Sequence, residues 1–190
     1  MAGEGEAGRP GSGRSSTGKA VDLARLLHMD CTRLLDLYKE RESFPSEDFL
    51  EDSRVVVVPL PCDNPSTDER VWILYAALGQ CLGHLQKLIS LEEETGCKDV
   101  TEEEYKYVRN NVHARLEHLL QSTRQFLVKD PDSGITEPPD GTGVDEADSS
   151  FQVKLWTYRV FEELIYWTGS ASRILHLLHT EREADEEVEL

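Results

Sequence analysis

Apolar residues recur every three or four positions in four stretches of this chain, and polar segments separate these stretches. The clearest pattern runs over 151–181. Its apolar positions are Val153, Trp156, Val160, Leu164, Trp167, Ala171, Ile174 and Leu178. At about 3.6 residues per turn, this spacing stacks the side chains on one face of a helix. The pattern therefore predicts a long amphipathic helix with a wide buried face.

The same period predicts three further helices, over about 19–41, 67–95 and 102–128. The second of them has local signals at both ends. Ser66 begins a Ser-x-x-Glu capping box, and Gly96 is well placed to end the helix in a left-handed conformation. We therefore expect an all-α protein with four long helices.

The connections between these predicted helices differ in length. Residues 42–65 and 129–150 are long and rich in proline, whereas the connection between the second and third helices is short. A short connection makes its two helices antiparallel neighbours, but an extended chain of more than twenty residues, at about 3.3 Å per residue, can run the length of a helix. This pattern favours a long-chain four-helix bundle in up-up-down-down order, with two long crossover loops. An up-down-up-down bundle with disordered loops is the alternative.

The ends of the chain and one loop segment lack a helical period. Residues 1–18 are rich in Gly, Ser and Glu, which predicts a disordered leader and places the four-helix domain at 19–182. Residues 183–190 form an acidic tail, which we expect to fray because negative charge at a helix C-terminus opposes the helix dipole. Val55–Val58 is an apolar run that we expect to lie extended against the core.

Charge and hydropathy exclude several classes of partner. The chain has 37 acidic and 20 basic residues, with a net charge of −17, so its surface repels phosphate and anionic lipid. We therefore expect no nucleic acid and no membrane among its partners. No apolar run approaches the roughly 18–20 residues that span a bilayer, and the first residues lack the apolar segment of a secretory signal. These features indicate a protein made in the cytosol.

The four cysteines, Cys31, Cys62, Cys81 and Cys97, contain no C-x-x-C pair, so neither a zinc site nor a dithiol redox motif is predicted. Cys31 and Cys81 lie on the apolar stripes of their helices, where a free thiol behaves as a small hydrophobic group. Because no secretory signal is evident, we expect all four to be reduced in the cell.

Motifs of enzymes are absent from the sequence. There is no H-E-x-x-H, no G-x-S-x-G and no glycine-rich phosphate loop. His176 and His179 share one side of the predicted fourth helix, but two ligands rarely make a metal site, so we interpret them as surface or edge residues. We therefore expect no enzymatic activity, no metal and no cofactor.

The start of the fourth helix carries the sharpest sign of a binding surface. Phe151, Lys154 and Tyr158 lie roughly 120–180° from the apolar stripe, with Leu155 nearby, so an aromatic ring and a cation face outward together. Such a pair is typical of a hot spot in a protein–protein interface. In the alternative interpretation, Phe151 precedes the regular helix and packs under the loop at 129–150.

The same stretch resembles part of a known family. The run FQVKLW at 151–156, the run RVFEEL at 159–164 and the pair Trp167-Thr168 are similar to the fourth helix of the ciliary neurotrophic factor family. That family belongs to the interleukin-6 group of long-chain helical cytokines. There, Phe-x-x-Lys-Leu-Trp leads into Val-Leu-x-Glu-Leu-x-x-Trp-Thr. The run Leu23–Arg25 is similar to the family's opening, so the resemblance covers parts of the first and fourth helices.

The resemblance implies an extracellular signalling ligand with no enzymatic activity. Such a ligand brings together the leukaemia inhibitory factor receptor and the shared signal-transducing receptor of the group. It thereby activates Janus kinase/STAT signalling and supports neuronal survival. Phe151 and Lys154 match the pair that engages the leukaemia inhibitory factor receptor, with Leu155 and Tyr158 as neighbours on that face. The exposed sides of the first and third helices would meet the shared receptor. The resemblance also implies a cytoplasmic protein released to the extracellular space without a signal peptide.

Two features depart from the family pattern. Where the family has an Arg-Ser pair that helps contact a specific α-receptor, this chain has Ser170 and Ala171, with Arg173 as the nearest cation. The family's tryptophan at the end of the first crossover is missing, and Cys62 lies near its place. A ciliary neurotrophic factor α-receptor region is therefore expected around Ser170 and Arg173, with altered chemistry. A cardiotrophin-like sister cytokine with different α-receptor use and an intracellular helical scaffold protein are the alternatives.

Overall fold

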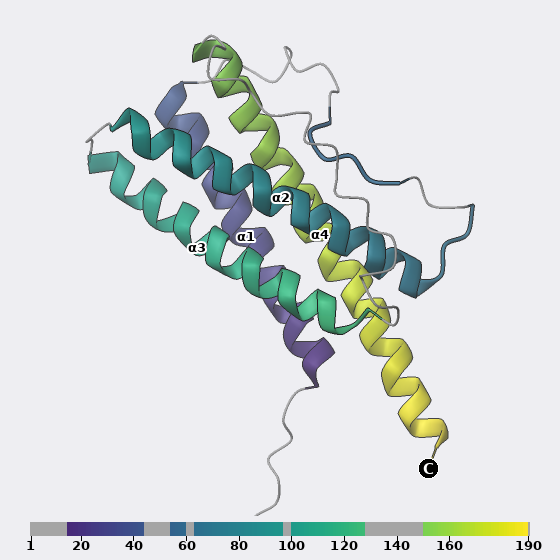
Figure 1. The fold of residues 1–190 in the computed structure, drawn as a ribbon. Helices are drawn as coiled ribbons and strands as arrows, with labels where there is room; N and C mark the ends of the chain where they lie inside the picture. The colour runs from purple at the N-terminus through teal and green to yellow at the C-terminus, as the bar shows by residue number, and fades with distance from the viewer. Residues whose placement is uncertain (1–14, 44–53, 60–62, 97–99, 128–149, 190) are drawn as a thin grey trace, which may run out of the picture.

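A computed structural model describes five segments of the chain, residues 15–43, 54–59, 63–96, 100–127 and 150–189. Four helices account for most of these residues (Figure 1), and no strand occurs within these segments. The helices are α1 (Ser16–Glu42), α2 (Thr67–Thr95), α3 (Val100–Gln125) and α4 (Ser150–Val188). The prediction of an all-α, four-helix architecture is therefore confirmed.

The first helix begins earlier than its apolar period suggests. Ser15 is the N-cap of α1, and its hydroxyl oxygen accepts a hydrogen bond from the Gly18 N–H at 3.2 Å. Because this cap satisfies one of the free N–H groups of the first turn, residues 16–18 are helical rather than part of a disordered leader. Residues 1–14, the rest of the predicted leader, lie outside the described residues.

The last helix is longer than predicted. α4 continues to Val188, so residues 183–188 are helical where the charge argument predicted fraying. Neither Gly nor Pro interrupts this stretch, and three of its six residues are Glu, which has high helix propensity. α3 differs in the other direction, because it ends at Gln125, three residues before the predicted boundary.

The second helix has the predicted bounds. Ser66 accepts a hydrogen bond from the Glu69 N–H, and the Glu69 carboxylate accepts one from the Ser66 N–H, which together form the predicted capping box. Gly96 ends the helix with a φ of 52°, in the left-handed region that glycine adopts without strain.

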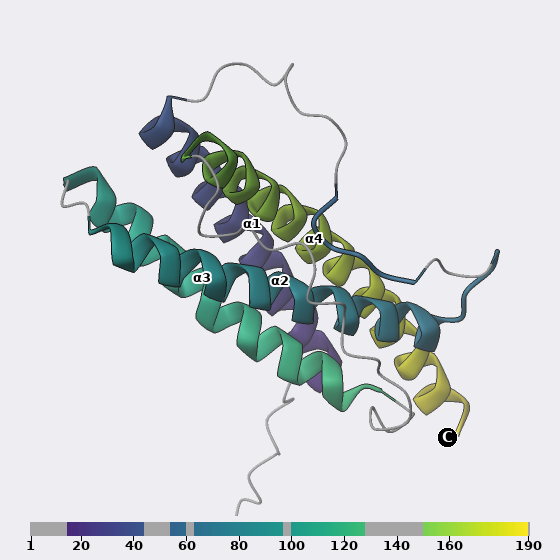
Figure 2. The ribbon, with the colours of Figure 1, turned by 45° about the horizontal axis from the view of Figure 1, so that its top comes forward.

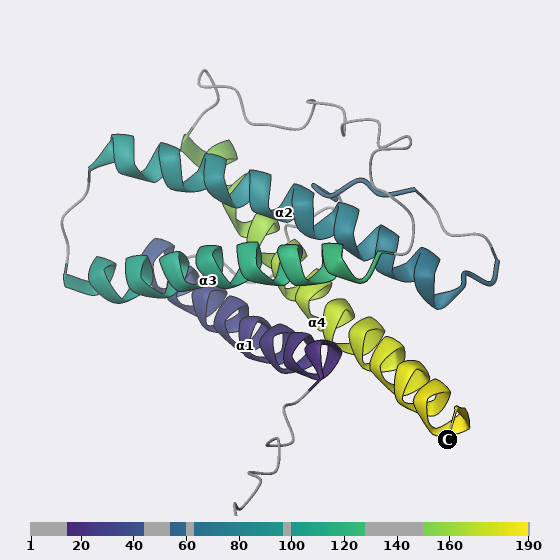
Figure 3. The ribbon, with the colours of Figure 1, turned by 60° about the horizontal axis from the view of Figure 1, so that its bottom comes forward.

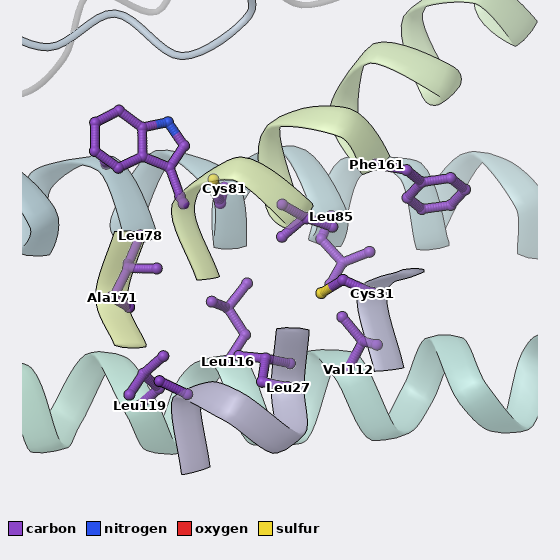
Figure 4. Packing of buried hydrophobic residues seen from close by; sticks show 14 of the residues in the cluster. Leu27, Cys31, Leu78, Cys81, Leu85, Val112, Leu116, Leu119, Phe161 and Ala171 are labelled. Carbon is purple, nitrogen blue, oxygen red and sulfur yellow. The ribbon is translucent and has the colours of Figure 1, made fainter. Parts of the chain in front are cut away.

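The core lies between the helices. α1 packs against α3 and α4, and α2 also packs against α3 and α4; Figure 2 shows α1 beside α4 and α2 beside α3. Side chains from all four helices point toward one another in the centre (Figure 4). They include Leu27, Cys31, Leu78, Cys81, Leu85, Val112, Leu116, Leu119, Phe161 and Ala171.

The valine run before α2 packs partly on the core, as predicted. Val55 and Val56 are buried, whereas Val57 is exposed. The side-chain amide of Gln80 in α2 accepts a hydrogen bond from the Val57 N–H at 2.9 Å and donates one to the Val57 carbonyl at 2.5 Å. Gln80 thus satisfies both backbone groups of Val57, much as a neighbouring strand would.

The two cysteines that the structure describes lie in the core. Cys31 and Cys81 are buried free thiols, which confirms their predicted positions on the apolar faces of α1 and α2. Burial raises the pKa of both thiols above the ordinary value, because a thiolate loses its hydration there. Cys62 and Cys97 lie outside the described residues. None of the helices in the described part of the chain combines the length and the apolar composition needed to cross a membrane.

Candidate functional site

Phe151 projects from the first turn of α4. Because the helix already begins at Ser150, Phe151 is a helical residue rather than one that precedes the helix. Its side chain is 64% exposed, as the outward-facing interpretation predicted. Large exposed aromatic rings are uncommon on a soluble domain and frequently mark contact surfaces.

Lys154, one turn further along α4, is fixed to the end of α1. Its ammonium nitrogen lies 2.6 Å from Oε2 of Glu42, although its side chain is still 45% exposed. The Tyr38 hydroxyl donates a hydrogen bond to the Lys154 carbonyl at 3.1 Å. Both the backbone and the side chain of Lys154 therefore contact α1, a relation that the sequence pattern did not reveal.

Tyr158 corrects one prediction, because this ring is buried at 3% exposure and does not belong to the outward face. Leu155 is half-buried. The reason is the length of α1. This helix ends opposite Lys154, so Phe151 extends beyond it, whereas Tyr158 lies further along α4 with the Lys39 ammonium 5.6 Å from its ring centroid. An outward position on the isolated α4 is covered by α1 in the bundle.

Lys154 is the first member of a series of ion pairs, in which cations and anions alternate from the surface to the core. The Arg41 Nε donates to Glu42 at 3.1 Å, and an Arg41 nitrogen lies 3.7 Å from a Glu92 oxygen in α2. Arg109 of α3 completes the series with a 2.5 Å contact to Glu92 and is only 2% exposed. We call Lys154, Glu42, Arg41, Glu92 and Arg109 the charge chain. It joins all four helices. We call this end of the bundle the upper end, because the end of α1 and the start of α4 lie at the upper left in Figure 1.

Aromatic rings enclose the charge chain and change the chemistry within it. The Arg41 guanidinium lies 4.5 Å from the ring centroid of Tyr105, and the Tyr105 hydroxyl donates to Glu92 at 2.6 Å. Burial and the nearby Glu92 charge raise the pKa of Tyr105, so its hydroxyl remains a donor. Burial alone would raise the pKa of Glu42, but hydrogen bonds from Lys154 and Arg41, together with their charges, lower it below the ordinary value.

The predicted α-receptor region contains a pocket. Ser170 is buried, and its hydroxyl accepts a hydrogen bond from Arg173 at 3.2 Å, so the structure brings these two predicted residues together. A pocket of about 400 Å³ is lined by Arg70, Ser170, Arg173, Ile174 and Leu177. Arg70 comes from α2, and sequence analysis missed it because no local motif links it to α4. Two guanidinium groups beside apolar side chains suit a carboxylate on a partner.

A third candidate surface is formed by the exposed faces of α1 and α3 where these two helices lie side by side. Arg33 pairs with Glu104 at 2.7 Å, and Asp30 forms an ion pair with Arg115. Three large apolar side chains are exposed on these two helices, at helical positions near the ion pairs. They are Leu26, Met29 and Tyr107. No motif in the sequence singled them out.

His176 and His179 do not act together. His176 is exposed, whereas Nδ1 of His179 lies 2.8 Å from Oγ1 of Thr17 in α1 and its Nε2 lies 3.3 Å from Glu183. Within the described segments, no group of three or more His, Cys, Asp or Glu residues is placed to hold a metal ion. His179 is therefore a packing residue between two helices.

His179 belongs to a set of contacts at the lower end of the bundle. Glu181 accepts a hydrogen bond at 2.7 Å from the Thr67 hydroxyl, in the first turn of α2. The Arg182 guanidinium lies 5.2 Å from the ring centroid of Phe126, just after the end of α3. We call His179, Glu181 and Arg182 the lower anchor, because within one turn of α4 they contact the ends of the other three helices. Figure 3 shows α4 continuing past α1 and α3 at this end.

In comparisons with known proteins, no family model, no curated protein and no solved structure matches this chain. What the protein does is therefore inferred from its own residues. Three surfaces are available for that inference: the start of α4, the side of α1 and α3, and the pocket between α2 and α4.

Proposed function

We propose that this protein is a signalling cytokine that brings together the leukaemia inhibitory factor receptor and the shared signal-transducing receptor of the interleukin-6 group. In this proposal it activates Janus kinase/STAT signalling, supports neuronal survival, and is made in the cytoplasm and released without a signal peptide. The observation that carries the proposal is the exposure of Phe151 together with Lys154, one turn apart at the start of α4. This is the aromatic–cation pair on which the resemblance rests.

The helix order of such cytokines is part of the proposal. Contacts of Thr17 with His179 and of Thr67 with Glu181 support α1 and α2 both beginning beside the end of α4. The contact of Glu42 with Lys154 supports α1 ending beside the start of α4. These contacts favour up-up-down-down order, which requires two long crossover connections. Residues 44–53, 60–62 and 128–149, within those connections, lie outside the described residues.

The side of α1 and α3 is the surface proposed for the shared signal-transducing receptor. Leu26, Met29 and Tyr107 supply exposed apolar contact area there. The cross-helix pairs formed by Arg33 and Asp30 already satisfy charges of α1, so desolvating this surface costs less than it would with unpaired ions. Apolar anchors among satisfied polar groups are typical of protein interfaces.

The pocket at Arg70 and Arg173 is the region proposed for a specific α-receptor. Its buried Ser170 occupies a place where the family carries an arginine, so the charge comes from Arg173, three residues later, and from Arg70 on α2. This different placement of cations favours a second candidate function. In that alternative, the protein is a cardiotrophin-like sister cytokine that uses a different α-receptor.

STAT phosphorylation tests the proposal. Purified protein is added to cells that bear the leukaemia inhibitory factor receptor and the shared receptor, with and without the ciliary neurotrophic factor α-receptor. The double variant Phe151→Ala/Lys154→Ala should lose signalling and keep its helicity, whereas the control variant Lys87→Ala, an exposed cation of α2, should signal normally. A response only with the α-receptor supports its use, and a response without it supports the sister cytokine.

Two outcomes would contradict the proposal. Full signalling by the double variant would remove the start of α4 as the receptor surface. No response in either cell type, together with recovery of one stoichiometric partner from cytosol, would instead support the intracellular scaffold protein.

A further inference from the structure

The partly exposed side chain of Lys154 has an ion-pair partner within the bundle. A lysine side chain has a flexible four-carbon stem and loses much rotational freedom when a partner orders it. Here the ammonium already lies 2.6 Å from Glu42, and the Tyr38 hydroxyl bonds to the Lys154 carbonyl. Almost half of the side chain still faces solvent. An incoming carboxylate would therefore meet a cation that is in place but accessible.

Glu42 can perform this holding because it is itself fixed. Its side chain is only 13% exposed, and Arg41 donates to it at 3.1 Å. Arg41 in turn lies between the Tyr105 ring and Glu92. Glu42 is the last residue of α1, and the N–H of Ser43 bonds back to the Lys39 carbonyl, which fixes the end of the helix. The Glu42 carboxylate thus has contacts within the protein to two cations and little exposed surface.

The charge chain also leaves a positive charge at the surface. It contains three cations and two anions, and the Glu42 carboxylate is shared between Arg41 and Lys154 rather than neutralising Lys154 alone. The chain as a whole has a net charge of −17, whereas these five residues carry one excess positive charge. A partner carboxylate beside Lys154 would gain from that charge at close range.

From these contacts we infer that Glu42 is a positioning residue of the Phe151–Lys154 surface, which fixes the Lys154 ammonium beside Phe151 without touching the partner. The inference rests on the proposed function, since the partner is the leukaemia inhibitory factor receptor. A lysine ordered before binding loses less entropy when the complex forms, so Glu42 increases affinity. In the opposite role, Glu42 would compete with the receptor for Lys154, and its removal would increase affinity.

The variant Glu42→Gln separates the two roles, because it keeps the shape of the side chain and removes its charge. Glu40→Gln is a matched control, since Glu40 lies two residues away in the same turn of α1 and is exposed. Binding is measured to the immobilised receptor ectodomain. We expect Glu42→Gln to weaken binding by about two- to tenfold, the effect of freeing one long side chain, and Glu40→Gln to bind as the unaltered protein does.

A double-mutant cycle assigns the effect to Lys154. If Glu42 acts through Lys154, the double variant Glu42→Gln/Lys154→Ala should bind no more weakly than Lys154→Ala alone. Equal or tighter binding by Glu42→Gln would overturn the inference, and so would a further loss in the double variant. If Lys154→Ala and Phe151→Ala bind normally, the proposed receptor surface itself has failed.

A measurement without receptor distinguishes failure of the positioning role of Glu42 from failure of the proposed receptor surface. NMR relaxation of the Lys154 side chain should show restricted motion in the unaltered protein and in Glu40→Gln, and increased motion in Glu42→Gln. Equal mobility of Lys154 in all three proteins would overturn the positioning role, whatever the receptor assay shows. Circular dichroism of each variant confirms that the helices are retained.

Discussion

The two ends of the bundle join the same four helices with different chemistry. At the upper end, the charge chain passes from α4 through α1 and α2 to α3, and its last member, Arg109, is almost fully buried. At the lower end, the lower anchor reaches the other helices from one turn of α4. It uses a hydrogen bond to Thr67, a ring contact to Phe126 and the contacts of His179.

This difference predicts unequal tolerance to substitution. A buried ion that loses its partner costs several kcal/mol, because the remaining charge can be neither hydrated nor paired. A single exposed hydrogen bond contributes much less, because water replaces the lost partner. The proposed receptor surface therefore lies at the end whose geometry is held by the more costly contacts. Rigid support of this kind suits a surface whose side chains must be in place before binding.

The largest effect should come from breaking the charge chain at its buried end. We expect Arg109→Met to lower the free energy of unfolding by about 3 kcal/mol, because Glu92 loses its closest cation. Urea unfolding followed by circular dichroism measures the change. Arg124→Met, which replaces an exposed arginine of the same helix, is the control. A loss for Arg109→Met no larger than that of the control would remove the proposed difference between the two ends.

A smaller effect should follow from removing one hydrogen bond within the same cluster. We expect Tyr105→Phe to cost about 1.5 kcal/mol, since its hydroxyl donates to the charged Glu92 and the phenyl ring cannot. Tyr107→Phe, on an exposed tyrosine of the same helix, should leave the unfolding midpoint unchanged. Equal midpoints for the two variants would mean that the Tyr105 hydroxyl is not part of the stabilising network.

The smallest effect should come from the lower anchor. Thr67→Val removes the hydroxyl that donates to Glu181 and keeps the shape of the side chain. We expect a loss of about 0.5 kcal/mol, because the Glu181 carboxylate can be hydrated instead. Hydrogen exchange of the first turn of α2 measures this change locally. A loss as large as that of Arg109→Met would show that the two ends are equally costly to disturb.

Local sequence signals predicted the helices well where they were strong. The bounds of α2 followed from Ser66 and Gly96, which act on their own backbone neighbours. The predicted fraying of residues 183–188 was wrong because an exposed charge near a helix end contributes only about 0.3–1 kcal/mol. The helix propensity of the Glu residues in this stretch, without Gly or Pro, outweighed that effect in α4.

The candidate site was predictable only as far as it depends on α4 alone. The exposure of Phe151 followed from the apolar period of that helix. The burial of Tyr158 and the contact between Lys154 and Glu42 depend on where α1 ends beside α4, which no pattern within either helix specifies. Arg70 was missed for the same reason, because it reaches the pocket from α2.

The proposed release would carry the protein from a reducing to an oxidising environment, and the buried thiols of Cys31 and Cys81 have a consequence for that step. Reaction with oxidants or disulfides requires the thiolate, and burial in the core disfavours that form for both residues. Neither side chain is accessible to glutathione or to a thiol reagent while the bundle is folded. The centre of the molecule would therefore keep the same covalent structure on both sides of a cell membrane.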